Sequence, residues 1–146
     1  MFVQVKTDDG HVAPYEQFPC SAITPKRGMA MILSSGKLAI ATGTAEPEFI
    51  CVEEHSAAVS AGDMVTVVRV DPQTEYETTL SAAGGSLKLG DKVTLHASSG
   101  LQVTATTTNG VAEIVGTIFG IRDSSAASLI AFFSLRGTKR QSFACM

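Results

Sequence analysis

The sequence predicts an all-β protein, either a small barrel or a sandwich. Short runs rich in β-branched and apolar residues recur along the 146-residue chain, and turn-forming residues separate them at regular intervals. This length favours one domain. The hydrophobic fraction of 45% is enough for an ordinary core that needs no disulfide bonds or structural metal ion. Each predicted element follows from the local pattern, in chain order.

The N-terminal part predicts an arm over residues 1–28 with a possible hairpin. Residues 2–6 alternate as a strand does, and the Asp-Asp-Gly at 8–10 predicts a turn. Residues 11–13 are the expected return strand, limited by the proline that follows. Residues 14–28 hold three prolines and a glycine, so we expect them to be irregular.

A β domain is predicted over residues 29–136, with a short polar tail over 137–146. Residues 42–54 form a turn-rich connection that ends on a short strand, and Pro47 suits the connection because it cannot donate to a sheet. The predicted strands are 29–33, 37–41, 49–53, 64–70, 75–80, 92–97, 101–106, 111–121 and 126–135.

Turn chemistry supports these boundaries. A Gly-Asp pair precedes the strand at 64–70, and another begins at residue 90, just before the strand at 92–97. Such a pair is typical of a turn, because glycine adopts the backbone angles of a tight turn and the aspartate side chain accepts hydrogen bonds from the turn backbone. Asn109-Gly110 predicts a hairpin, and with it a four-strand meander over residues 91–136. Gly116 and Gly120 inside one strand predict a bulge or a sharp bend.

Charge and composition bear on the class of partner. The net charge is −3 and the basic residues are scattered, so a nucleic-acid-binding stripe is not expected. The longest apolar run, Leu129 to Phe133, is too short to span a bilayer, and no secretory leader is visible. Cys20, Cys51 and Cys145 match no zinc spacing, and their odd number favours reduced thiols. We therefore expect a soluble protein made in a cytoplasm.

Few residues suggest chemistry. Glu53, Glu54 and His55 are consecutive, but neighbours in a strand point to opposite faces and do not converge. Cys51 lies within an apolar run, as a buried thiol does, and no nucleophile elbow is present. Residues 85–92 superficially resemble a phosphate loop, but a strand and not a helix follows them. We predict no catalytic, cofactor or metal residues and no enzymatic activity.

An ordered set of segments resembles the head decoration proteins of tailed bacteriophages and prophages. The segments are ITPKRGMAM (23–31), GKLA (36–39), GTAEPEFI (43–50), GDMVTVVRV (62–70), ETTL (77–80), GDKV (90–93) and NGVAEIV (109–115). The resemblance implies a small β-barrel or β-tulip-like domain. It implies a capsid cement protein that binds the outer surface of the assembled head, often as a trimer, and clamps the major capsid protein against internal DNA pressure.

The resemblance also implies where contact is made. In some members of the family an N-terminal arm adds a strand to the capsid, which here corresponds to Phe2, Val3, Gln4 and Val5. The family carries no catalytic residues to transfer. The expected location is the virion surface, after synthesis in the host cytoplasm, with no direct contact to nucleic acid or membrane.

Two alternatives remain at this stage. One is an adhesion or carbohydrate-binding module on a virion or cell surface, although the absence of Trp and the presence of only two Tyr disfavour sugar stacking. The other is a small β-barrel enzyme or a cupin-like ligand-binding protein. His11, His55 and His96 are far apart in the sequence and share no motif, which disfavours such a site.

Overall fold

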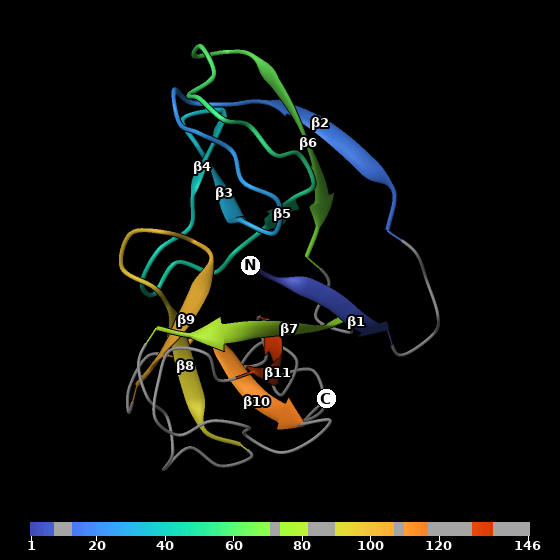
Figure 1. The fold of residues 1–146 in the computed structure, drawn as a ribbon, viewed down its shortest axis with the longest axis vertical. Helices are drawn as coiled ribbons and strands as arrows, with labels where there is room; N and C mark the ends of the chain where they lie inside the picture. The colour runs from blue at the N-terminus through green and yellow to red at the C-terminus, as the bar shows by residue number, and fades with distance from the viewer. Residues whose placement is uncertain (8–12, 71–73, 82–89, 107–109, 117–129, 136–146) are drawn as a thin grey trace.

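Eleven strands in two sheets make up the part of the chain that the computed structural model describes, residues 1–7, 13–70, 74–81, 90–106, 110–116 and 130–135 (Figure 1). The strands are β1 (Val3–Thr7), β2 (Tyr15–Pro19), β3 (Ala30–Ser34), β4 (Lys37–Ile40), β5 (Phe49–Cys51), β6 (Met64–Arg69), β7 (Thr74–Leu80), β8 (Lys92–Leu95), β9 (Gln102–Ala105), β10 (Ala112–Gly116) and β11 (Ile130–Leu135). The predicted all-β class is confirmed, with no helix among these residues.

One sheet has five strands in the order β2-β6-β5-β3-β4. An isolated bridge between Cys20 and Leu38 also joins the end of β2 to β4. Val65 and Val67 alternate along β6 and are fully buried, so one face of β6 supplies the core of this sheet. The predicted turn between β3 and β4 is confirmed, because Ser35 and Gly36 both have positive φ, 51° and 76°.

The other sheet has six strands in the order β1-β7-β11-β10-β8-β9, and β7 also pairs with β9 in parallel. The pairings therefore run from β7 through β11, β10, β8 and β9 back to β7. Tyr76, Leu80, Val93, Leu95 and Val103 fill the interior of this cycle. Strand β1 lies outside the cycle, beside β7 in the middle of the molecule (Figure 1).

The predicted meander is confirmed in two of its pairings, β8 with β9 and β10 with β11, and is wrong in the pairing of β9 with β10. Strand β10 pairs with β8 and not with β9, because the edge of β9 is occupied by β7. The chain passes around the start of β8: the Thr106 N–H donates to the Lys92 carbonyl (3.3 Å) and the Val111 N–H to the Val93 carbonyl (3.0 Å). A Cβ at Gly110 would lie 2.5 Å from the Lys92 Cβ, so glycine serves this close crossing, while Asn109 is outside the described residues.

The N-terminal part is more regular than predicted, and the return strand expected at 11–13 falls mainly outside the described residues. Strand β1 pairs with β7, from Val3↔Glu77 to Thr7↔Thr74, and the turn at 8–12 lies outside the described residues. Part of the predicted irregular arm is strand β2, which pairs with β6 from Tyr15↔Val68 to Pro19↔Met64. Pro19 is compatible with this pairing because it ends an edge strand, where a missing N–H is tolerated.

The connection from β4 to β5 joins the two sheets. Strands β4 and β5 lie on opposite sides of β3, so residues 41–48 cross over it. The Glu48 N–H donates to the Met31 carbonyl (2.9 Å), and the Gly43 carbonyl accepts from the Leu95 N–H of β8 (2.9 Å). The bulge predicted at Gly116 is confirmed by a register shift after Ile114, whereas Gly120 and the tail at 137–146 fall outside the described residues.

Candidate interaction groove

The N-terminal residues are held between the two sheets. Phe2 is 3% exposed and belongs to the core of the six-stranded sheet. The Phe2 N–H donates to the Gly28 carbonyl (2.8 Å), and the Gly28 N–H donates to the Cys51 carbonyl of β5 (2.8 Å). Of the four predicted contact residues, Phe2 is thus a core anchor, and Val3 and Gln4 are exposed. Val5 lies in β1, but its side chain is not among those described.

Gly28 makes this docking possible. Its φ is 77°, in the left-handed region that favours glycine. A Cβ at this position would lie 2.9 Å from both the N and the O of Phe2, and 2.1 Å from the Met1 side chain. Because backbone atoms cannot move aside as a flexible side chain can, a larger residue would displace the N-terminal strand.

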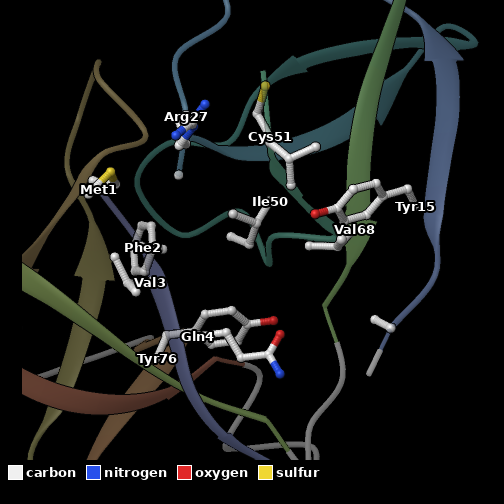
Figure 2. Close-up of a pocket in the computed structure, with 13 residues that line it drawn as sticks. Met1, Phe2, Val3, Gln4, Tyr15, Arg27, Ile50, Cys51, Val68 and Tyr76 are labelled. Atoms are coloured by element: carbon white, nitrogen blue, oxygen red, sulfur yellow. The ribbon is translucent and has the colours of Figure 1, made fainter. Parts of the chain in front are cut away.

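A groove lies between β1 on one side and β2, β5 and β6 on the other, with a volume of about 640 Å³ (Figure 2). Tyr15, Val68 and Ile50 form one row across the three strands, since Val68 pairs with both of the others. Directly paired residues share a face of the sheet, so this row presents its side chains together toward β1. Val3 and Tyr76 line the opposite wall, and Gln4 and Arg27 are polar lining residues.

The mouth of the groove combines apolar exposure with unpaired strand edges. Tyr15 is 73% exposed and Val3 is 44% exposed, whereas Ile50 and Tyr76 deeper inside are 4% and 2% exposed. Strand β1 ends the order of the six-stranded sheet, and β2 ends that of the other. Among the described strands, β1 therefore has one neighbour and one open side.

The groove was not predicted from the sequence, because its wall comes from three separated segments. The sequence signal was weak but present: Val67 and Val68 are adjacent, so β6 carries apolar side chains on both faces. Val67 faces the core of its own sheet, and Val68 faces the groove. A strand that is apolar on both faces requires cover on both, and the cover over Val68 is partial.

The acids and histidine after β5 have structural partners. Glu53 Oε2 accepts the Thr66 N–H (2.6 Å), and Glu53 Oε1 lies 3.9 Å from His55 Nε2. Glu54 Oε2 accepts the Arg27 N–H (2.7 Å), and Glu54 Oε1 lies 3.4 Å from Lys26 Nζ. These contacts tie the chain after β5 to β6 and to the loop before β3.

The charge state of Glu54 follows from these contacts. The Arg27 N–H bond, and after it Lys26, lower the pKa of the Glu54 carboxyl. Glu54 is therefore ionised at neutral pH. No group of three or more His, Cys, Asp and Glu side chains suited to a metal ion occurs among the described residues.

Cys20 and Cys51 are free, buried thiols in the core of the five-stranded sheet. Burial raises the pKa of both, that of Cys51 to about 11, and the nearby charge of Glu53 acts in the same direction. A thiol with this pKa is overwhelmingly protonated at neutral pH and is a poor nucleophile. Cys145 lies outside the described residues.

Comparison with known proteins leaves the chain without an assigned family. No protein-family model matches it, and no curated protein matches it. No helix in the described part of the chain is long and apolar enough to cross a membrane.

Proposed function

We propose that the protein is a phage capsid decoration protein that binds the outer surface of the assembled head as a homotrimer. The observation that carries the proposal is the ordered series of segments between residues 23 and 115 that resembles this family. The all-β architecture is of the kind that the resemblance implies. The exposed Val3 and Gln4, on an edge strand anchored by Phe2, supply a surface suited to contact with another protein.

In this function the protein stabilises the head because it binds the assembled form and not the separated subunits. A protein that binds the assembled head but not separated subunits shifts the equilibrium toward the assembled head. A trimer that touches several major capsid subunits gains affinity through effective concentration, even if each contact is weak. No catalytic step is part of this function.

Co-sedimentation tests the binding step directly. Purified protein is mixed with expanded heads assembled from the major capsid protein encoded in the same genome, and separately with unassembled subunits. We expect saturable binding to the heads and no binding to the subunits. Binding that is equal for both, or absent from the heads, would contradict the proposal.

The adhesion alternative is less well supported. Carbohydrate-binding surfaces use exposed aromatic rings as stacking platforms. Among the described residues, Tyr15 is the one aromatic side chain in the group of strongly exposed large hydrophobics. Phe18 packs on Phe49 with ring centroids 4.9 Å apart and is half-buried. A single exposed ring does not make a platform.

A further inference from the structure

We propose that the groove between β1 and the row Tyr15, Val68 and Ile50 binds an extended segment of a partner protein. The segment pairs with the open edge of β1, places an apolar side chain against Val68, and carries an acidic residue that meets Arg27. This inference goes beyond the proposed function, since it specifies the chemistry of a peptide ligand whatever assembly supplies it.

The backbone of β1 supplies the first recognition element. The Phe2 N–H points away from β7, because it donates to Gly28. Phe2 directly precedes β1, and backbone groups two residues apart in an extended chain point the same way. We therefore infer that the N–H and C=O of Gln4 point away from β7 and toward the groove that Gln4 lines, just before the register of β1 shifts. An extended peptide is the ligand that satisfies a strand edge, since its own N–H and C=O groups repeat at the same spacing.

The apolar wall supplies the second element. The groove has a volume of about 640 Å³, which lies within the range of roughly 300–1,000 Å³ typical of ligand sites. Ile50 and Tyr76 are almost fully buried at its base, and Tyr15 stands 73% exposed at its mouth (Figure 2). An inserted apolar side chain would remove Tyr15 and Val68 from water, and that burial provides the affinity.

Arg27 supplies the third element. Its backbone N–H is fixed by Glu54, and Glu54 also pairs with Lys26. The Arg27 guanidinium is exposed and makes no ion pair with any described residue, and its charge acts at longer range to help lower the pKa of Glu54. A carboxylate on the peptide would complement this charge and fix the register of the segment.

Peptide selection identifies the ligand and tests the groove. Random peptides of about twelve residues, long enough for an extended segment, are displayed and selected on the full-length protein. They are then counter-selected on Val68→Trp, which fills the groove. We expect a consensus of alternating apolar residues with one acidic residue. Synthetic peptides of that consensus should bind Val68→Trp at least about tenfold more weakly than wild type.

Two variants separate groove filling from general damage. Met64→Trp is the matched control, because Met64 is 54% exposed on the same face of β6 and does not line the groove. It should bind the peptide as wild type does. If Val68→Trp fails to fold, Tyr15→Ala removes an exposed side chain at the mouth and should weaken binding by about fivefold.

A second pair of variants tests whether the backbone of β1 contributes to peptide binding. Gln4→Pro removes the N–H that faces the groove, whereas Gln4→Ala keeps it. We expect Gln4→Pro to bind about tenfold more weakly than Gln4→Ala, with thermal unfolding confirming that both are folded. Arg27→Ala should weaken binding of the acidic peptide, and Arg27→Lys should restore most of it.

Four results would overturn the inference. They are selection of no peptide whose binding depends on Val68 or Tyr15, equal binding by Gln4→Pro and Gln4→Ala, equal binding by Arg27→Ala and wild type, and self-association of the wild type that Val68→Trp abolishes. The last result would show a second copy of the chain in the groove. The first three do not bear on binding to heads, and the fourth bears only on where copies of the chain meet, so co-sedimentation with heads tests the proposed function separately.

Discussion

At the scale of single residues, the account depends most on Gly28, where the N-terminal strand meets the five-stranded sheet. We predict that Gly28→Ala destabilises the protein by about 2–4 kcal/mol, since it adds a backbone clash to the cost of a positive φ. Urea denaturation measures the change.

The matched control is Gly36→Ala. Gly36 has nearly the same φ, 76°, but an added Cβ would meet no atom within 4 Å. It should cost only about 1 kcal/mol, which is the conformational part. Equal losses in the two variants would show that close packing against Phe2 has no role.

A second residue-scale prediction concerns Cys51 and pH. The unfolded thiol ionises near its ordinary pKa of 9.0, while the buried thiol stays protonated until about 11. The folded state therefore binds more protons in this window and loses stability as the pH rises through it. We expect the free energy of unfolding to fall by roughly 1 kcal/mol more in wild type than in Cys51→Ala between about pH 8 and about pH 10. Parallel pH profiles for the two proteins would contradict the buried-thiol assignment.

Some residue roles were predictable and others were not. The apolar neighbours of Cys51 predicted a buried thiol, and the glycine within a strand at Gly116 predicted a bulge. The burial of Phe2 was not predictable, because its contacts come from Gly28 and from β7, which are distant in the sequence. The same holds for the groove, whose wall is assembled by pairing and not by a motif.

Among the elements, strand positions and the pairing of neighbouring strands such as β8 with β9 and β10 with β11 were predicted, whereas pairings between distant strands were not. Alternation and turn residues are local, so the runs at 64–70 and 92–97 matched β6 and β8. Pairing depends on which edges remain free after the sheet closes. Thus β10 pairs with β8 and not with β9, and β1 pairs with β7, which lies about 70 residues away in the sequence.

The docking of β1 is testable as an element. Phe2→Ala should cost about 3–5 kcal/mol, because a buried ring is removed from the core. It should also speed hydrogen exchange of the amides that join β1 to β7. Val3→Ala, on the same strand but 44% exposed, should change stability by less than about 0.5 kcal/mol. If Phe2→Ala proved as mild as Val3→Ala, β1 would be a loosely attached arm.

At the scale of the whole molecule, the two sheets share a core. Ala30, Ala41 and Ile50 belong to the five-stranded half of the chain but pack with the interior of the six-stranded sheet. The Ala30 N–H donates to the Gly100 carbonyl (2.8 Å), which adds a backbone connection between the halves. The described part of the chain therefore presents its groove and exposed edge strand on one joined body.

We propose that the protein stabilises an assembled head, and the rupture temperature of expanded heads measures that stabilisation. Heads lacking the protein are heated with and without saturating purified protein, and release of packaged DNA is followed by dye fluorescence. We expect added protein to raise the rupture temperature by several degrees. Heads that rupture at the same temperature with and without the bound protein would contradict it.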